Sequence, residues 1–177
     1  MGSIRLGYGL HYFLNEYILS NRCRRIMEIG VADGENAGNM VKTALQNFSS
    51  GEVEYSGFDL FEGDGDSRMQ QVSRKLKKTG CKFELFKGDS VKTLSEVVKA
   101  FPKMDLIFID GGHSYVTVKS DWENSKSLMH DETAVFFHNY DFSGPKRVVD
   151  DISRGEYHIE IIHPPSDYDT ALVKKKV

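Results

Sequence analysis

The chain has 177 residues, of which 40% are hydrophobic and 28% are charged, and its formal net charge is −3. This length suits one domain with a hydrophobic core, so we expect residues 1–177 to form a single unit without a linker or a repeat. The charge gives no general attraction to nucleic acid or anionic lipid, and no apolar run approaches the roughly 20 residues of a membrane span. We therefore expect neither nucleic acid nor a membrane as a partner.

The cysteines and the N-terminal residues indicate in which cellular compartment the protein is expected. Cys23 and Cys81 are far apart and both adjoin strand-like runs, which predicts buried, reduced thiols rather than a disulfide framework or a zinc site. The N-terminus shows neither the apolar run nor the cleavage pattern of a signal peptide. We expect a cytoplasmic protein.

Strand-like and helix-like segments alternate along the chain. Helices are recognised by apolar residues at a spacing of about 3.6, and strands by short apolar or alternating runs. In chain order, the pattern predicts a helix over 10–19, a strand at 25–29, a helix over 37–48, a strand at 53–58, a helix from Met69 to Leu76, a strand at 82–86, a helix from Ser90 to Phe101, a strand at 104–109, a helix from Val118 to Met129, a strand at 133–137, a helix from Pro145 to Ile152, and strands at 157–162 and 170–175.

The order of these segments predicts the fold class. Alternating strands and helices form a mostly parallel, doubly wound α/β sheet with helices on both faces. The apolar run at 104–109 suits a strand buried on both faces, and the last two strands, with no helix between them, should pair antiparallel. Ser90 is expected to cap the helix that it begins, and the lysines at 174–176 are expected to discourage pairing at a sheet edge.

Polar residues follow the first five predicted strands at the point where each strand ends. In an open α/β sheet, ligands bind beyond the carboxyl ends of the strands. A loop or a helix cap explains any one of these residues, but not their repetition at the same place in five successive units. We therefore predict one binding site along this edge. The residues concerned are Glu28 with Gly30, Asp59, Asp89, Asp110, and His138 with Asn139.

The first of these turns runs from Glu28 to Asn36 and joins a strand to a helix. Gly30 and Gly34 allow a tight turn and a close approach of a ligand to the backbone, although many dinucleotide-binding folds share such a turn. The turn is acidic and contains no lysine or arginine, so it would repel a pyrophosphate. A cofactor with a cationic centre, a ribose and a single carboxylate fits better, and S-adenosylmethionine has that pattern.

The next two strand ends suit the nucleoside part of such a cofactor. Asp59 can accept hydrogen bonds from both ribose hydroxyls, although it would have the same role with a nicotinamide cofactor. Asp89 can accept a hydrogen bond from an adenine amino group, and the backbone N–H of Ser90 can meet a ring nitrogen. A plain helix cap explains Asp89 and Ser90 nearly as well.

The sequence Asp110-Gly-Gly-His113 follows the most hydrophobic strand. Histidine is the usual general base at neutral pH, so His113 is a candidate base; a buried histidine held by a backbone carbonyl is the alternative. His138 and Asn139 follow the next strand and could bind a metal with Asp110, or a substrate hydroxyl. Because magnesium prefers several carboxylate oxygens, we predict no required metal.

Five motifs in a fixed order resemble those of the class I S-adenosylmethionine-dependent methyltransferases. The similarity is greatest to the small branch whose fourth strand ends Asp-Gly-x-His-Ser-Tyr, and it extends from about residue 24 to the end of the chain. The motifs are Glu28-Ile-Gly-Val-Ala-Asp-Gly34, Gly57-Phe-Asp59, Gly88-Asp89-Ser90, Phe108-Ile-Asp-Gly-Gly-His-Ser-Tyr115 and Lys146-Arg-Val-Val-Asp150.

The resemblance implies a Rossmann-like, seven-stranded sheet whose last strand is inserted antiparallel, and S-adenosyl-L-methionine as the cofactor. Related metal-dependent O-methyltransferases carry two acidic residues, or Asp-Asn, after the fifth strand, whereas this chain has His138-Asn139, which argues against a magnesium mechanism. The residues expected to bind the cofactor are Glu28, Gly30, Val31, Ala32, Gly34, Asn36, Asp59, Leu60, Asp89, Ser90, Asp110, Gly111 and His113. Those expected to take part in catalysis are His113, Asp110 and His138.

The expected activity is methyl transfer to a small-molecule acceptor, with oxygen as the first choice of acceptor atom. Two other classes stay open: an NAD-dependent oxidoreductase on a similar sheet, and a protein that binds S-adenosylmethionine without methylating. Little chain is left for a substrate lid. Only residues 1–21, with the N-terminal helix, and the loop at 140–146 are available to cover an acceptor, and a homodimer is another way to complete the site.

Overall fold

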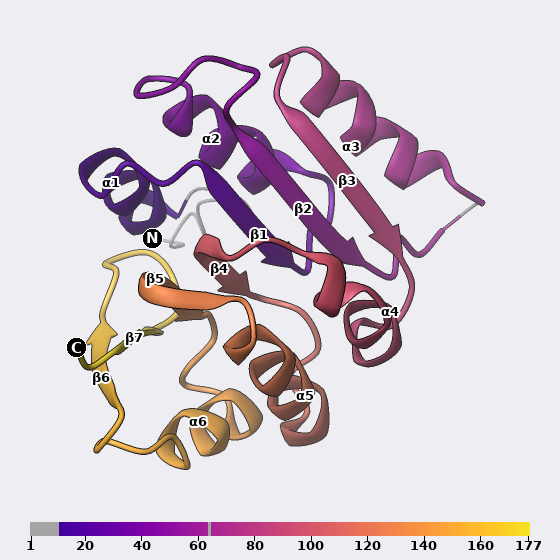
Figure 1. The fold of residues 1–177 in the computed structure, drawn as a ribbon. Coiled ribbons are helices and arrows are strands. Elements are labelled where there is room, and N and C mark those ends of the chain that lie inside the picture. Colours follow the sequence, from indigo (N-terminus) through magenta and orange to yellow (C-terminus); the bar gives the residue numbers. More distant parts are fainter. Residues whose placement is uncertain (1–10, 64) are drawn as a thin grey trace, which may run out of the picture.

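The computed structural model describes residues 11–63 and 65–177 (Figure 1). Its centre is a seven-stranded sheet in the order β3-β2-β1-β4-β5-β7-β6. The strands are β1 (Arg25–Ile29), β2 (Glu54–Asp59), β3 (Lys82–Lys87), β4 (Met104–Ile109), β5 (Met129–Phe137), β6 (Tyr157–Ile162) and β7 (Thr170–Lys175). The helices are α1 (Tyr12–Ser20), α2 (Glu35–Ala44), α3 (Ser67–Lys77), α4 (Ser90–Val97), α5 (Tyr115–Lys126) and α6 (Ser143–Asp150), with a 3-10 turn at Val98–Ala100.

The strand pairing confirms the predicted fold class. β1 pairs in parallel with β2 and β4, and β3 and β5 extend the parallel part on either side. β7 pairs antiparallel with both β5 and β6. Because β7 lies inside the sheet, the expectation that the lysines at 174–176 protect an edge is wrong. β6 is the edge strand at this end.

Helices cover both faces of the sheet, and each face has its own hydrophobic core (Figure 1). α1, α2 and α3 contribute to one core, and α4, α5 and α6 to the other. β4 contributes side chains to both cores. Leu106 and Phe108 pack into the first core, and Ile107 and Ile109 pack into the second. The predicted strand buried on both faces is therefore confirmed.

Two predicted details are wrong for local reasons. Asp89, not Ser90, caps α4, because the Asp89 carboxylate accepts a hydrogen bond from the Val91 N–H at 3.0 Å. Met129 begins β5 rather than ending the preceding helix, since it pairs with Met104 of β4. A buried methionine suits either a helix or a strand, so its apolar character alone did not decide between them.

All six predicted helices differ in their bounds from the observed ones, as the first two illustrate. The helix predicted over 10–19 is α1, which begins at Tyr12, and residue 10 lies outside the described residues. The helix predicted over 37–48 is α2, which ends at Ala44. The following residues form tight turns, in which Asn47 N–H donates to the Ala44 carbonyl at 3.0 Å. The helical spacing of apolar residues therefore continues past the end of the helix.

Cys23 and Cys81 are both buried and unpaired, as predicted. Within residues 11–63 and 65–177, no helix combines the length and the apolar character that crossing a membrane requires.

Candidate active site

The first five strands bring their polar ends to one edge of the sheet. β1 to β5 run parallel, so their carboxyl ends lie side by side. The residue that follows β1, β3, β4 or β5 donates a backbone hydrogen bond to a neighbouring strand, and these four bonds hold the strand ends in one row. These bonds run from Gly30 N–H to Phe58 (2.8 Å), Gly88 N–H to Asp59 (2.9 Å), Asp110 N–H to Ile29 (2.8 Å) and His138 N–H to Ile109 (3.0 Å).

Gly30 allows the first turn to reach the end of β4. Its φ angle is +93°, and a Cβ atom there would stand 2.1 Å from the carbonyl oxygen of Asp110, so no other amino acid fits. Among the described non-glycine residues with positive φ, Ala32, Phe61 and Asn139 each lie within three residues of a strand end at this edge. Strained backbone of this kind gathers at binding and catalytic sites.

Asp59 fixes the shape of the first turn. Its Oδ2 accepts hydrogen bonds from the N–H groups of Val31 (2.8 Å) and Ala32 (2.9 Å), and its Oδ1 accepts one from Phe61 N–H (2.5 Å). A carboxylate has about four acceptor positions, so these bonds leave one, on Oδ1. In this conformation Asp59 has room for one ribose hydroxyl rather than the two that we expected.

We predict that Asp59→Asn destabilises the turn. The amide nitrogen of asparagine donates rather than accepts, so at least one of the three backbone N–H groups loses its partner. The expected loss is roughly 1–3 kcal/mol in the free energy of unfolding, measured by urea denaturation. The matched control is Asp89→Asn, because asparagine caps a helix as well as aspartate does. Equal losses in the two variants would contradict the bracing role of Asp59.

Glu28 lies inside the protein, 1% exposed, at the end of β1. Burial raises the pKa of its carboxyl to about 8; hydrogen bonds from Tyr55 and Asn36 work against that shift, and the charges of Asp110 and Asp59 add to it. Asn36 Nδ2 donates to Glu28 Oε1 at 2.7 Å, and the Tyr55 hydroxyl donates to Oε2. Three acidic side chains from neighbouring strands therefore influence one another at this edge.

Asn36 leaves one hydrogen-bonding atom unused beside Glu28. The residue is 7% exposed, and its buried Oδ1 has no donor among the described residues. Buried acceptors are nearly always satisfied in folded proteins, so an unpaired one next to a buried carboxylate suits a ligand that carries N–H donors.

The outer side of the first turn is less negative than its sequence predicts. Lys75 of α3 contacts the carboxylate of Glu35 and donates to the carbonyl oxygen of Asp33 at 2.8 Å. The prediction overstated the negative charge of the turn, because it considered only the lysines and arginines within the sequence of the turn itself. On the inner side, by contrast, Glu28 is held by neutral groups, those of Asn36 and Tyr55.

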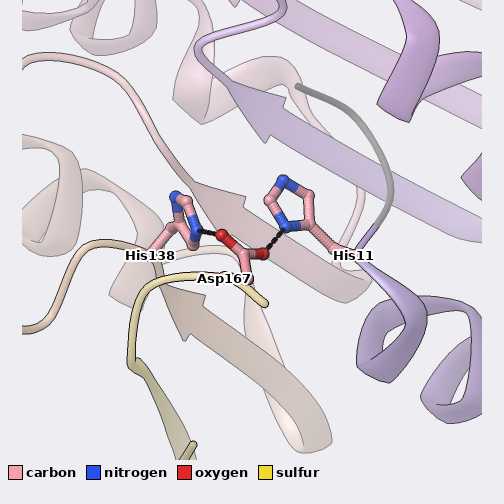
Figure 2. Close-up of side chains that lie close together, drawn as sticks. All are labelled: His11, His138 and Asp167. Carbon is pink, nitrogen blue, oxygen red and sulfur yellow. Dashed lines mark hydrogen bonds and ion pairs between the residues drawn. The ribbon is translucent and has the colours of Figure 1, made fainter. Parts of the chain in front are cut away.

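At the β4 and β5 ends, acidic and histidine side chains form a chain of contacts (Figure 2). Asp110 Oδ1 lies 2.8 Å from His138 Nδ1, and the other ring nitrogen of His138, Nε2, lies 3.0 Å from Asp167 Oδ1. Asp167 Oδ2 in turn lies 2.5 Å from His11 Nδ1. Both histidines are buried, and His11, the residue before α1, is thereby joined to the loop between β6 and β7.

The surroundings of His138 favour its charged form. Burial opposes the charge, but the hydrogen bonds and negative charges of Asp110 and Asp167 outweigh it and raise the pKa of His138 to about 9. Burial also opposes the charge of Asp167, yet its bonds with the two histidines hold the pKa of Asp167 well below its ordinary value. With both ring nitrogens engaged, His138 has no free lone pair with which to take a proton from a substrate.

His113 is exposed at the edge of the site, so the alternative of a buried histidine does not apply. Its ring lies 4.8 Å from that of Phe142, which lies 5.3 Å from that of Tyr168, both nearly perpendicular. These three rings come from the loops that follow β4, β5 and β6. They form an aromatic wall, and the Tyr168 ring also lies 6.1 Å from that of His138.

The other predicted residues lie along the β1 to β4 part of the edge. Leu60 is 50% exposed and follows Asp59 directly. Asp89 is exposed, and its carboxylate caps α4, which is the plain role considered from the sequence. Gly111 sits against Ile29 of β1, since a Cβ atom there would stand 3.3 Å from that side chain.

Sequence reasoning missed four residues of the site: His11, Tyr55, Lys75 and Asp167. Each lies outside the strand-end motifs, and each reaches the site from a distant segment. The sequence had offered no pairing signal, because His11 and Asp167 are separated by 156 positions.

Comparison with known proteins identifies the family. Residues 27–140 match a protein family described as a methyltransferase domain. No curated protein matches the chain in sequence.

Several solved structures share the fold. The TDP-rhamnose 3'-O-methyltransferase CalS11 of calicheamicin biosynthesis is 18% identical, with a TM-score of 0.76 over 92% of this chain and 76% of its own. The O-methyltransferase TomG from Streptomyces achromogenes, solved with S-adenosylmethionine, is 14% identical, with a TM-score of 0.76 over 93% and 78%. An O-methyltransferase from Bacillus cereus, solved with S-adenosylhomocysteine, is 14% identical, with a TM-score of 0.75 over 93% and 79%. By its sequence this chain belongs to the methyltransferase-domain family, and its fold is that of the class I S-adenosylmethionine-dependent methyltransferases.

Proposed function

We propose that the chain transfers a methyl group from S-adenosylmethionine to a hydroxyl oxygen of a small molecule, at the edge formed by β1 to β5. The observation that carries this proposal is the row of acidic strand ends, in which the buried Asn36 Oδ1, without a donor among the described residues, lies beside the buried carboxyl group of Glu28. Because the chain belongs to the methyltransferase-domain family, the alternative of an NAD-dependent oxidoreductase has no support.

The residues at the first turn fit the cofactor. Asn36 Oδ1 and Glu28 would hold the ammonium group of its methionine part, and the open acceptor position on Asp59 would hold a ribose hydroxyl. Leu60 offers an exposed apolar side chain for the adenine, next to Asp89 and Ser90. When bound, the cofactor supplies an electrophilic methyl group on a sulfonium ion.

The residues at the β4 and β5 ends suit the acceptor. The wall of His113, Phe142 and Tyr168 would hold the acceptor, since flat apolar surfaces orient a sugar or a phenol ring. His113 is the candidate general base, because it is exposed at this wall while both nitrogens of His138 are engaged. Asp110, which lies three residues before His113 and is bonded to His138, would stabilise the positive charge that His113 gains with the proton.

Two features support this choice of acceptor and compartment. CalS11 is named as a methyltransferase of a sugar hydroxyl, and TomG as an O-methyltransferase. The formal net charge of −3 disfavours nucleic acid as an acceptor. The two buried, unpaired thiols support a reducing compartment such as the cytoplasm.

We predict that His113→Ala lowers the turnover number far more than the affinity for the cofactor. Loss of a general base costs a factor of about 100 to 10,000 in rate, whereas the dissociation constant for S-adenosylhomocysteine should change by less than about threefold. Acceptors are first sought among sugars and phenols by the release of S-adenosylhomocysteine. Calorimetry then gives the affinity, and the same release assay gives the rate.

The control for this prediction is His158→Ala, because His158 is exposed on the edge strand β6, outside the proposed site. Equal losses of turnover and affinity in His113→Ala would contradict the base role. If the protein binds the cofactor but methylates no acceptor in the panel, it is the non-methylating binding protein, and the proposed function is wrong.

A further inference from the structure

We propose that His11, His138 and Asp167 form a binding site for one divalent transition-metal ion. The three residues come from distant parts of the chain: the segment before α1, the end of β5, and the loop between β6 and β7 (Figure 2). Their potential ligand atoms all lie within 4.8 Å of one another, and each histidine is 7% exposed. The proposal concerns ion binding alone and stands apart from the proposed methyl transfer.

The spacing of the three side chains is close to that of a coordination site. Asp167 stands between the rings, with Oδ2 at 2.5 Å from His11 Nδ1 and Oδ1 at 3.0 Å from His138 Nε2. Ligand atoms around a tetrahedral zinc ion lie about 3.3 Å apart, because each metal–ligand bond is close to 2 Å long. Small rotations of side chains already facing one point would therefore suffice.

Asp110 supplies the outer support that a metal-binding histidine requires. A histidine that binds a metal nearly always donates its other ring N–H to a carboxylate or a carbonyl. Asp110 Oδ1 lies 2.8 Å from Nδ1 of His138, which places the proton of a neutral ring on that side. A bound ion would take the place of the proton between Nε2 and the carboxylate of Asp167, and it would receive the lone pair that this proton otherwise occupies.

The ligand types select the class of ion. Two imidazoles and one carboxylate suit zinc and its neighbours, whereas calcium and magnesium prefer oxygen ligands throughout. Three protein ligands leave one position open for water or another oxygen ligand. The site also differs from the set of Asp110, His138 and Asn139 considered from the sequence, because Asp110 here holds the histidine rather than the ion.

The test is direct binding of Co²⁺ and Zn²⁺ to the full chain, prepared without a histidine tag and treated with a chelator. We expect one equivalent of Co²⁺ to bind and to give visible absorption of a four-coordinate site, which an equivalent of Zn²⁺ abolishes. His11→Ala and Asp167→Asn should remove this absorption at concentrations that saturate the original protein. Asp110→Asn should keep the absorption bands and weaken binding by about 10- to 100-fold.

A fourth variant keeps the test informative if His11→Ala folds poorly. In His11→Cys a thiolate replaces Nδ1 as the ligand. The cysteine side chain is shorter than that of histidine, and the longer metal–sulfur bond of about 2.3 Å makes up part of this difference. A new, intense charge-transfer band with Co²⁺ would then mark residue 11 as a ligand. A merely structural role for His11 would give no such band.

The matched control is His163→Ala. His163 lies in the same loop as Asp167 and contacts Asp169 at 2.8 Å, but its side chain is 70% exposed and forms one such pair among the described residues, so binding should be unchanged. The proposal is overturned if the original protein binds neither ion, or if His11→Ala and Asp167→Asn bind as it does. It is equally overturned if Asp110→Asn loses the ion while His11→Ala keeps it, since the ion would then lie on Asp110.

Discussion

Replacing Gly144 with alanine is expected to destabilise the protein by about 3 kcal/mol or more. Gly144 is the second residue of α6, and a Cβ atom there would stand 2.0 Å from the carbonyl oxygen of His113 and 2.9 Å from the backbone of Ser114 and Tyr115. All of these are backbone atoms, so no flexible side chain can move aside. The free energy of unfolding, measured by urea denaturation, gives the size of the loss.

The same substitution should also impair methyl transfer. To make room, α6 and the loop after β4 must move apart, and that loop carries His113, the proposed base. We expect the turnover number of Gly144→Ala to fall even at temperatures where circular dichroism shows the variant still folded, while the affinity for S-adenosylhomocysteine falls less. Undiminished turnover in the folded variant would show that the position of this loop does not matter.

Gly38→Ala is the matched control for stability. Gly38 is also a buried glycine in a helix, α2, but apart from the backbone of its own helix no described atom lies within 4 Å of the position of its Cβ. Alanine is the better helix former by about 1 kcal/mol, so Gly38→Ala should equal the original protein in stability or exceed it by up to that amount. If both glycine variants lost similar amounts, a general intolerance of helix substitutions would explain Gly144, and the contact with His113 would not.

Much of the fold could be predicted from the sequence, because hydrophobic periodicity reports local structure. The bounds of β1, β4, β6 and β7 match the predicted strands, and the absence of a helix between the last two strands correctly implied antiparallel pairing. The errors arose where one residue fits two patterns. Met129 is apolar and buried in either element, and the pairing of β5 with β4 decided between them.

The sequence predicted that the residues of the candidate site lie in one row, but it did not predict the contacts that their side chains form. The strand-end motifs located Glu28, Asp59 and Asp110 at one edge, because parallel strands align their carboxyl ends. What each side chain contacts depends on segments that pack there from elsewhere. The burial of Glu28 against Tyr55 and the pairing of Asp167 with His11 are tertiary contacts, which no local sequence pattern predicts.

Glu28→Gln is expected to make the protein more stable as the pH rises, relative to the original chain. The pKa of Glu28 is about 8 in the folded protein, against 4.5 for an ordinary glutamate. Between these values the unfolded chain ionises while the folded protein keeps its proton, so the free energy of unfolding falls by about 1.4 kcal/mol per pH unit. Below pH 4.5 Glu28 is neutral in both states and contributes nothing to the slope.

Glutamine carries no proton to lose, so the variant lacks this slope. The stability advantage of Glu28→Gln should therefore grow from pH 5 to pH 8 and reach a total on the order of 5 kcal/mol. Urea denaturation at each pH measures it. The control, Glu84→Gln, changes an exposed carboxyl on β3 to an amide and should leave the slope as it is. An advantage that stays constant across this range would mean that Glu28 is ionised in the folded protein.

The same proton links Glu28 to the cofactor. An ammonium group beside Glu28 favours the carboxylate, so binding must release the proton that the free protein holds below pH 8. We expect the affinity for S-adenosylhomocysteine to rise nearly tenfold from pH 6 to pH 7 and less steeply towards pH 8, and to be flat over this range in Glu28→Gln. Calorimetry at pH 7 in buffers of different ionisation enthalpy should show release of close to one proton by the original protein and none by the variant. If both release the same number, the cofactor's ammonium group does not bind at Glu28, whatever the stability measurements give.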